Sequence, residues 1–563
     1  MANWTKRNKI KVKDDLLLIE KLAMVRGIKN LEEWMNPPSS FVNSPYSLLN
    51  MDTAVEMILK AIHKQMKICI VADIDTDGVC STGIMYNYLR ELTQNVVYIH
   101  AQRSQGHGLE TVLDKIEDDV DLVIIVDSSS NSVEACKELH DKGLPIVIID
   151  HHEVDRENPY ATIVNCQLGD YPNKHLSGSA MCYKVCQVID EYLSIELADD
   201  FRDLSAIGIV ADMMDVRNME NRYLIYNGIN NINNLGIKEI LKQSKIDFSE
   251  GINSTNISFK IAPIIGACSR FDKIELALEL VTCDDEVRVK ELVKEMISMN
   301  EERKANQKKY VENAIESIDD SNNIIIYVDN NIDSGFRGLI ATEFVERFSK
   351  PVLVLAEFKD DEGNVIEYKG SARSVGVLPL KSMCESTELF KLTQGHEGAF
   401  GVGFTVENLQ AIISYFNDTL DSTDLQKSIV YDLELEASDI EEMDIKQVEK
   451  FSKIVGQGFK EPKFLVKGLI VEEEETKKLG KYVRAVMGSN NDTVKIPCED
   501  GFALMKFRTQ DTYAEDIEAH FYGNFATEID AIGSLNLNRF YHGGHKRWIT
   551  TKQVFLEDYR IAD

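Results

Sequence analysis

The sequence predicts an α/β protein with two lobes and a small β-barrel at the C-terminal end, and three observations support this fold class. Three short apolar runs in the first third each end in an aspartate, and helical patterns separate them. A stretch without glycine or proline, from Asp284 to Ser317, precedes a second alternation of strands and helices. From about Ser428 onward, short strand-like runs alternate with turn signals. A chain of 563 residues is too long for one hydrophobic core.

The first lobe is predicted to contain a parallel sheet. The runs "ICIVAD", "LVIIVD" and "IVIID" are continuous and rich in β-branched residues, as strands buried on both faces are. They end at Asp73, Asp127 and Asp150, and the helical patterns between them imply right-handed crossovers. Because ligands bind outside the carboxyl ends of such strands, we expect the three aspartates to collect along one edge.

The rest of the chain is predicted to form a connecting helix, a second lobe and the barrel. Val289, Leu292, Val293 and Met296 mark one helical face in the connector. The second lobe begins with "NIIIYVD", "GLIATEFVERFS" and "PVLVLAEF", and its segments "YKGSARSVG" and "QGHEGAFGVGF" are predicted to be glycine-rich loops. The strands of the barrel are predicted from "PKFLVKGLIVEE", "YVRAVMG", "TVKIPCE", "GFALMKF", "EIDAIGSLNLN" and "QVFLEDYRI", with "EEEE" at 472–475 as a turn.

Composition and charge narrow the class of protein. The formal net charge of −31 argues against a surface that nucleic acid coats generally. By itself it favours a small anionic substrate held through metal ions, or no nucleic acid, and it leaves room for a local basic channel. No apolar run is long enough to span a bilayer, so we expect a soluble cytoplasmic protein without membrane contact. The ten cysteines are scattered, which is typical of reduced, buried thiols.

Two acidic segments are candidates for a metal site. The segment "ADIDTDGVCST" alternates Asp73, Asp75 and Asp77, and carboxylates so close repel one another unless cations neutralise them. An ordinary turn is an equally good interpretation of this segment alone, and an EF-hand loop is disfavoured because the closing glutamate is missing. In "AIGIVADMMD", Asp212 follows an apolar run and is a better ligand candidate than Asp215.

The segment "IIDHHEVD" places two histidines directly after the strand that ends at Asp150. Neighbours in an extended segment point to opposite sides, so we expect one of His151 and His152 to bind metal and the other to face substrate or a supporting partner. An imidazole with several carboxylates suits a two-metal site that activates water against a phosphate ester. Arg373 and His396 are expected in loops whose N–H groups hold phosphate. Arg103 and Arg270 show no local sign of a role, and exposed salt bridges are their default interpretation.

Taken in order, these segments resemble the DHH phosphoesterase superfamily and, within it, the RecJ single-strand-specific exonucleases. The lead-in "LAMVRGIKNLEEWMNPP" is followed by the matching motifs "ADIDTDGVCST", "IVDSSS", "IDHHE" with "ATIVN", and "GIVADMMDVRNMENR". The segments "GFRGLIATEFVERFSKPVLVL", "KGSARS" and "GHEGAFGVGF" are similar to the DHH-associated second lobe, and the tail resembles the RecJ OB-fold. The resemblance covers nearly the whole chain.

The resemblance implies a set of site residues. It implies that His151 binds metal and that Asp150 and His152 support the catalytic site with Asp127. Two divalent ions, Mn²⁺ or Mg²⁺, are expected as cofactors. Their implied ligands are Asp73, Asp75, Asp77, Asp127, His151 and Asp212, and the residues implied to hold substrate phosphates are Arg103, Arg270, Ser371, Arg373 and His396.

It also implies a domain order and an activity. The expected parts are a lead-in (1–55), a DHH catalytic domain (56–283), a connecting helix (284–318), a DHH-associated domain (319–424) and an OB-fold-like domain (425–563). The expected activity is 5′-to-3′ degradation of single-stranded DNA to mononucleotides in recombination and repair. We expect a monomer, with a helicase or single-strand-binding protein as candidate partner.

Two alternatives stay open. One is a DHH phosphodiesterase acting on short oligonucleotides or cyclic dinucleotides, and the long lead-in and tail argue against it. The other is a non-catalytic scaffold that binds single strands, and the intact set of ligands argues against it. The acidic net charge fits both alternatives slightly better than it fits the exonuclease.

Overall fold

The computed structural model describes residues 3–13, 15–106, 108–249, 251–376, 378–421, 428–471, 494–499, 501–506, 528–542 and 547–562. The chain forms two compact units, so this division has fewer parts than the five that are predicted. One unit joins residues 1–38 to residues 428–563, and the other comprises residues 39–427. Within the described ranges, no helix combines the length and the apolar character needed to cross a membrane.

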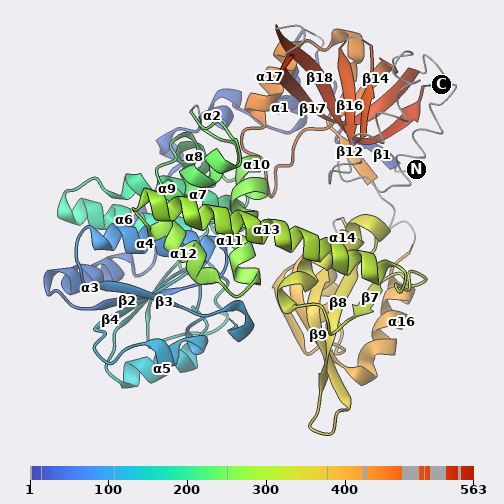
Figure 1. The fold of residues 1–563 in the computed structure, drawn as a ribbon. Coiled ribbons are helices and arrows are strands. Elements are labelled where there is room, and N and C mark those ends of the chain that lie inside the picture. Colours follow the sequence, from blue (N-terminus) through green and yellow to red (C-terminus); the bar gives the residue numbers. More distant parts are fainter. Residues whose placement is uncertain are drawn as a thin grey trace. The chain divides into compact units, whose positions relative to one another are not determined.

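The larger unit begins with the predicted parallel sheet (Figure 1). Its strands run in the order β3-β2-β4-β5-β6 and pair in parallel throughout. Their bounds are β2 (Ile68–Ala72), β3 (Val96–His100), β4 (Leu122–Val126), β5 (Ile146–Asp150) and β6 (Thr162–Asn165). Every residue of β2, β4 and β5 is buried, which explains why these strands are continuous apolar runs without polar alternation.

Helices surround this sheet, and three of them pack closely around its carboxyl end. The helices of this lobe are α3 (Met51–His63), α4 (Thr76–Arg90), α5 (Val133–Asp141), α6 (Gly178–Leu193), α7 (Arg202–Ala211), α8 (Met219–Asn230), α9 (Leu235–Gln243), α11 (Ala262–Arg270) and α12 (Ile274–Thr282). The mutual packing of α4, α6 and α7 depends on small residues. A side chain at Gly208 of α7 would collide with Asp77 and Ser179, so only glycine fits there.

The helix α13 (Glu286–Ile315) lies within the stretch where the connector is predicted, and at 1.5 Å per residue it is about 45 Å long. Asp285 caps its first turn by accepting from the N–H groups of Val287 and Arg288. The helix leads into the second lobe, where β7 (Ile325–Val328), α14 (Ser334–Phe348) and β8 (Val352–Lys359) form as predicted.

The prediction of glycine-rich loops in this lobe is wrong. The segments form β9 (Val365–Arg373), β10 (Leu392–His396) and β11 (Ala399–Thr405), in a sheet of order β10-β11-β9-β8-β7 that is antiparallel except for β7 with β8. Their glycines serve close approach between strands rather than flexibility. A side chain at Gly370 would collide with the backbone of Val354 in the neighbouring strand.

The smaller unit holds both ends of the chain. Its strand β1 (Asn3–Lys6) pairs in parallel with β12 (Ser428–Tyr431). The fully buried Asp432 binds two N-terminal arginines, with Oδ1 2.6 Å from Nε of Arg7 and Oδ2 2.7 Å from Nη2 of Arg26. Trp34 of α2 (Leu31–Met35) packs on Phe459, with 4.8 Å between the ring centroids. Residues 1–38 are therefore a structural part of this unit.

The C-terminal sheet has the strand order β13-β14-β17-β18-β16-β15. Its strands are β13 (Leu433–Glu436), β14 (Phe464–Ile470), β15 (Val494–Pro497), β16 (Phe502–Lys506), β17 (Glu528–His542) and β18 (Arg547–Ile561). Five of the six predicted runs coincide with these strands. The sixth, "YVRAVMG", and the predicted turn at 472–475 lie outside the described residues. Closure of this sheet into an OB-like barrel stays a prediction.

Candidate metal centre

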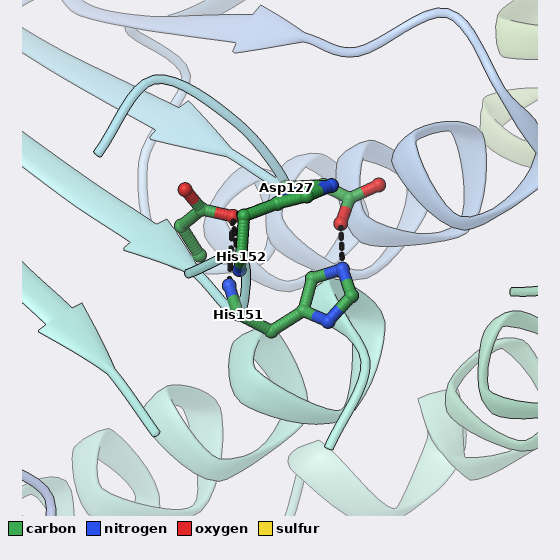
Figure 2. Close-up of side chains that lie close together, drawn as sticks. Asp127, His151 and His152 are labelled. Atoms are coloured by element: carbon green, nitrogen blue, oxygen red, sulfur yellow. Dashed lines mark hydrogen bonds and ion pairs between the residues drawn. The ribbon is translucent and has the colours of Figure 1, made fainter. Parts of the chain in front are cut away.

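The carboxyl ends of β2, β4 and β5 bring acidic side chains together, as the sequence predicts. Asp73 follows β2, Asp127 follows β4, and Asp150 is the last residue of β5; β4 pairs with both of the other strands. His151 comes next and lies beside Asp127 (Figure 2). Potential ligand atoms of Asp73, Asp75 and Asp127 all lie within 4.8 Å of one another, and so do those of Asp77, His151 and Asp212.

His151 is placed to share a cation with two carboxylates. Its Nε2 lies 3.3 Å from Oδ1 of Asp127 and 3.4 Å from Oδ2 of Asp212. These three atoms are buried and have no hydrogen-bond partner, which is costly unless an ion takes that place. Carboxylates with one imidazole are a donor set that suits Mn²⁺ or Mg²⁺. The residues present therefore fit divalent cations.

The N-terminus of α6 fixes Asp77. The backbone N–H of Gly178 donates to Oδ2 of Asp77 at 2.7 Å, and that of Ser179 donates to Oδ1 at 3.2 Å. A helix N-terminus favours negative charge, so this contact stabilises the carboxylate that the fold buries. A side chain at Gly178 would collide with Asp127, so this glycine lets α6 approach two acidic groups at once.

Asp75 and Asp215 differ from the buried carboxylates. Asp75 is exposed, and its side chain caps α4 by accepting from the N–H of Gly78 at 2.9 Å. Asp215 binds Arg217 at 2.6 Å and belongs to none of the three possible metal groups found among the described residues. The preference for Asp212 over Asp215 agrees with this placement.

Crowding of like charges perturbs the titration of the cluster. Burial, together with the charge of Asp75, raises the pKa of Asp73 to about 8. Burial and the charges of Asp77 and Asp75 raise the pKa of Asp212 to about 9. Burial and four neighbouring carboxylates raise the pKa of Asp127 well above its usual range. Without cations, Asp73 and Asp212 retain protons near neutral pH.

His152 and Asp150 form a second, differently balanced pair. Nδ1 of His152 lies 2.8 Å from Oδ1 of Asp150, and this contact outweighs burial to raise the pKa of His152 to about 9. Asp150 also accepts from the backbone N–H groups of Ser130, His151 and His152. Against its burial, the contacts with His152 hold the pKa of Asp150 below its ordinary value. His152 is exposed and carries a positive charge at neutral pH.

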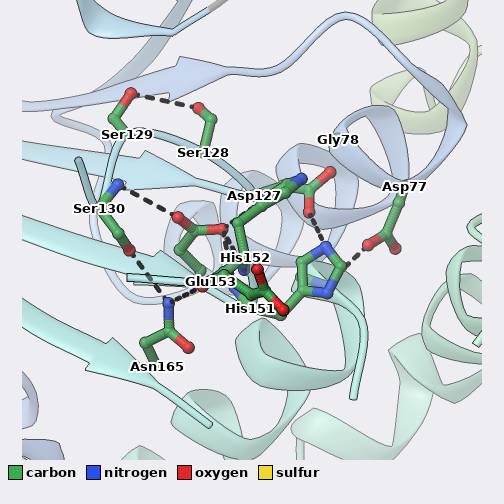
Figure 3. Close-up of polar contacts among 12 residues, drawn as sticks. Asp77, Gly78, Asp127, Ser128, Ser129, Ser130, His151, His152, Glu153 and Asn165 are labelled. Carbon is green, nitrogen blue, oxygen red and sulfur yellow. Dashed lines mark hydrogen bonds and ion pairs between the residues drawn. The ribbon is translucent and has the colours of Figure 1, made fainter. Parts of the chain in front are cut away.

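The expectation that the two histidines point to opposite sides is wrong. Their ring centroids lie 4.4 Å apart, with the rings tilted by 52°. The reason is that β5 ends at Asp150, so the next two residues are no longer extended strand. Their environments still differ, because His151 is buried and lies beside Asp127 (Figure 3), whereas His152 is exposed and bonded to Asp150.

Arginines from four elements, one of them Arg373 of β9, gather near the junction of the two lobes. Arg270 ends α11, Arg103 begins a short helical turn, and Arg303 lies in α13. Burial and the positive charges of Arg103, Arg303 and Arg373 together lower the pKa of Arg270 to about 9. Like charges held this close favour an anion between them. Arg270 is not the exposed salt-bridge residue that its sequence context favours, since its guanidinium donates to the carbonyl of Gly335.

The second lobe presents Arg373 and His396 at strand ends, not in phosphate-cradling loops. Arg373 is the last residue of β9, and Ser371 lies two positions before it in the same strand. Two glycines of helix α14 lie next to Arg270 and Arg373. Gly335 lies against Arg270, and a side chain at Gly338 would collide with Arg373. His396 ends β10 and is exposed. The loop interpretation fails because Gly370 of β9 and Gly395 of β10 lie against the backbones of neighbouring strands.

Sequence reasoning missed several residues that shape the site. Arg303 carries no motif and reads as the polar face of a long helix. Ser130 and Asn165 hold the β5 end, since Asn165 donates to Oγ of Ser130 at 3.1 Å and to the carbonyl of His152 at 3.0 Å (Figure 3). An asparagine at the end of β6, beside the strand that ends in Asp150, was the available signal.

Comparisons with known proteins agree with this geometry. Residues 67–209 match the model of the DHH family, N-terminal domain. A protein of the SPbeta prophage in Bacillus subtilis, named as a single-strand DNA-specific exonuclease, is 29% identical over 544 residues, covering 92% of either chain. The single-stranded-DNA-specific exonuclease RecJ of Bacillus subtilis is 28% identical over 501 residues, which cover 85% of this chain and 62% of that one.

Solved structures give the same fold. The crystal structure of RecJ from Thermus thermophilus in complex with Mn²⁺ matches with a TM-score of 0.76 and 19% identity, covering 100% of this chain and 80% of that one. Residues 67–209 thus form a DHH domain, the class that the parallel sheet and its acidic edge define. The chain as a whole is RecJ-like in sequence and in fold.

Proposed function

We propose that this protein is a metal-dependent exonuclease that degrades single-stranded DNA from the 5′ end to mononucleotides, in recombination and repair. The observation that carries the proposal is a group of three buried atoms that can act as metal ligands, on Asp127, His151 and Asp212. These atoms have no hydrogen-bond partners and fit divalent cations. The RecJ-like sequence over most of the chain supports the choice of substrate. Digestion of end-labelled single strands, with either end blocked and with Mn²⁺ or Mg²⁺, tests polarity and substrate together.

Different residues of the chain would have different roles at the scissile phosphate. Two groups would hold the cations, Asp73 with Asp75 and Asp127 in one and Asp77 with His151 and Asp212 in the other. When bound, two such ions polarise the phosphate and lower the pKa of an attacking water. The N–H groups of α6 hold Asp77 in place for this role.

His152 would supply a positive charge at the open side of the site. Its Nδ1 is occupied by Asp150, so in the charged form the Nε2–H is the donor left for a phosphate oxygen. The hydrogen bond and the charge of Asp150 are the main contacts that raise the pKa of His152. Asp150 acts by orienting His152 and the backbone around it.

The arginine cluster would hold the 5′ end of the strand. A terminal phosphate carries extra negative charge, and guanidinium groups bind phosphate oxygens as planar forks. Arg103, Arg270 and Arg373 approach one another from different elements, and Ser371 lies on the same strand as Arg373. We include His396 as a further phosphate contact. It ends β10, which pairs with β11, and β11 pairs in turn with β9.

Replacing Arg373 with alanine should raise KM on 5′-phosphorylated strands by on the order of tenfold, the loss expected for one charge-assisted contact. The preference for 5′-phosphate over 5′-hydroxyl strands should shrink by a similar factor. Steady-state kinetics on both strands measures this. The matched control is Arg347→Ala, an exposed arginine at the end of α14 in the same lobe. An unchanged preference would remove Arg373 from end binding.

The smaller unit would help to hold the strand, as an OB-like module does by stacking and local charge. A chain of residues 39–427 keeps every proposed metal ligand. It should cleave very short strands at nearly the full rate and bind long strands more weakly, in fluorescence anisotropy. Cutting only at Ser428 is a poorer test, because β1 and Arg26 would lose β12 and Asp432. Equal loss on short and long strands would mean that the unit is only structural.

We extend the proposal to the cellular setting. We propose a cytoplasmic monomer whose unpaired strands a helicase or single-strand-binding protein supplies. Of the alternatives, a phosphodiesterase acting on short oligonucleotides or cyclic dinucleotides does not use the smaller unit, which amounts to residues 1–38 and 428–563. A non-catalytic scaffold does not need a complete ligand set, and the described residues provide one.

A further inference from the structure

A buried polar cluster around α8 includes none of the proposed metal ligands. Its centre is Glu220, in the first turn of α8 and 2% exposed. The carboxylate accepts from the backbone N–H and the side-chain amide of Asn43 at 2.9 and 2.8 Å, from the hydroxyl of Tyr171 at 2.8 Å and from the amide of Asn173 at 3.1 Å. Nζ of the fully buried Lys184 lies 2.8 Å from it. We call these five residues the Glu220 cluster.

The first link from this cluster leads to Asp212. The amide of Asn173 also donates to Oδ1 of Asn221 at 2.9 Å. Asn221 in turn donates to the carbonyl of Asp215 at 3.1 Å, in the turn that joins α7 to α8. Asp212 begins this turn, and Met213 beside it has a left-handed backbone with φ of 56°. A turn with such a residue depends on its surroundings to hold its shape.

The second link leads to His151. Oδ1 of Asn173 accepts from the N–H of His175 at 3.0 Å, and Asn221 donates to the carbonyl of His175 at 2.6 Å. The loop of residues 166–175 is thereby fixed at one end. At its other end the side-chain amide of Gln167 donates to two carbonyls, that of Lys174 at 2.8 Å and that of His151 at 3.0 Å.

The third link leads to Asp77 through α6. Lys184, which binds Glu220, lies about two turns from the helix end at which Gly178 and Ser179 donate to Asp77. Asp77, His151 and Asp212 are the three residues of one possible metal group. All three are therefore connected to the same buried carboxylate, although they come from different segments of the chain.

Stability alone is a weak reason for this arrangement. Burial lowers the pKa of Lys184, and Glu220 offsets only part of that effect. A buried ion pair is often no more stabilising than apolar residues of the same volume, whereas it fixes geometry because each donor must find its acceptor. The contacts of the Glu220 cluster define where three separate segments lie.

We propose that Glu220 is a positioning residue, which aligns the segments carrying Asp77, His151 and Asp212 so that their ligand atoms meet at one cation. This inference rests on the proposed metal centre. Glu220 itself belongs to none of the possible metal groups found in the described part of the chain. Loss of residues that orient metal ligands typically weakens metal affinity 10- to 100-fold.

The test is Mn²⁺ binding to the full-length chain, followed by electron paramagnetic resonance of the free ion and by calorimetry. The variant Glu220→Gln should weaken the tighter Mn²⁺ site by about tenfold or more. The matched control is Asp190→Asn in α6. Asp190 is also a buried carboxylate with several donors, Tyr88 at 2.7 Å and the N–H groups of Leu197 and Ala198 at 2.9 and 2.8 Å. It lies near the C-terminal end of α6, whereas Asp77 is held at the N-terminal end. Both variants should lose thermal stability, and only Glu220→Gln should lose Mn²⁺ affinity.

A second variant guards against a general folding defect. Asn221→Ala leaves the Glu220–Lys184 pair in place and removes the bonds to Asp215 and His175. It should also weaken Mn²⁺ binding, and excess Mn²⁺ should restore cleavage by both variants. Wild-type Mn²⁺ affinity in Glu220→Gln and Asn221→Ala would overturn the positioning role. A wild-type protein that binds no Mn²⁺ would instead overturn the proposed function.

Discussion

Replacing Asp127 with alanine should reduce cleavage of single-stranded DNA about a thousandfold or more, the scale seen when a group that stabilises transition-state charge is removed. Asp127 belongs to the possible metal group with Asp73 and Asp75, and its Oδ1 also lies 3.3 Å from Nε2 of His151, which belongs to the other group. Its loss should therefore weaken both cation positions. Initial rates on a 5′-phosphorylated strand in Mn²⁺ and in Mg²⁺ measure the effect.

The control for this experiment lies at the other end of the same strand. Asp121 precedes β4 and accepts from the N–H of Lys67 at 2.8 Å, away from the carboxyl edge. Asp121→Ala should leave cleavage within about twofold of the wild type. The metal-free Asp127→Ala protein should melt no lower than the wild type, because burial and the neighbouring carboxylates make the charged form of Asp127 unfavourable in the fold. Turnover at the wild-type rate by Asp127→Ala would exclude this site from the chemistry.

Mn²⁺ affinity should rise steeply between pH 6 and pH 9. The pKa of Asp73 is raised to about 8 and that of Asp212 to about 9, and a cation binds only the deprotonated forms. For each proton that Mn²⁺ displaces, its affinity should increase by at most about tenfold per pH unit. Calorimetry in buffers of different ionisation enthalpy counts the protons released. The variant Asp212→Asn should release one proton fewer, and an affinity that is flat over this range would contradict the assignment.

The same groups give the metal-free protein a pH-dependent stability of definite sign. A carboxyl whose pKa is raised on folding contributes its full stabilisation at a pH below its pKa in the unfolded chain, which is near 4. This contribution is lost as the pH rises through the pKa of the folded state. For Asp73 the loss falls between pH 4 and pH 8. Metal-free melting temperatures should therefore fall as the pH rises from 5 to 8.5. Saturating Mn²⁺ should remove most of that slope.

The sequence predicts the first lobe well because its signals are local. An apolar strand followed at once by Asp73, Asp127 or Asp150 identifies both the strand and the edge on which the carboxylate lies. The motif order then indicates the family before any contact is known. The second lobe is predicted less well, since glycines in β9, β10 and β11 resemble loop signals until the neighbouring strand is known to pass within contact distance.

What the sequence could not supply are relations between distant segments. Arg303 joins the arginines only because α13 carries it past Arg270. Glu220 looks like a surface residue of an amphipathic helix, and nothing nearby in the chain indicates Lys184 as its partner. The same is true of Asp432, whose partners Arg7 and Arg26 lie at the opposite end of the sequence. These contacts depend on the complete fold, not on a local pattern.

The pairing of β1 with β12 has a consequence for the order in which the protein matures on the ribosome. Arg7 and Asp432 are separated by 425 positions, so the first strand to be synthesised has no partner until most of the chain exists. At about 5–20 residues per second, that interval lasts roughly 20–85 s. The 39–427 unit has all of its own strands before then. We therefore expect nascent chains to acquire the metal centre well before they acquire the unit proposed to hold the strand.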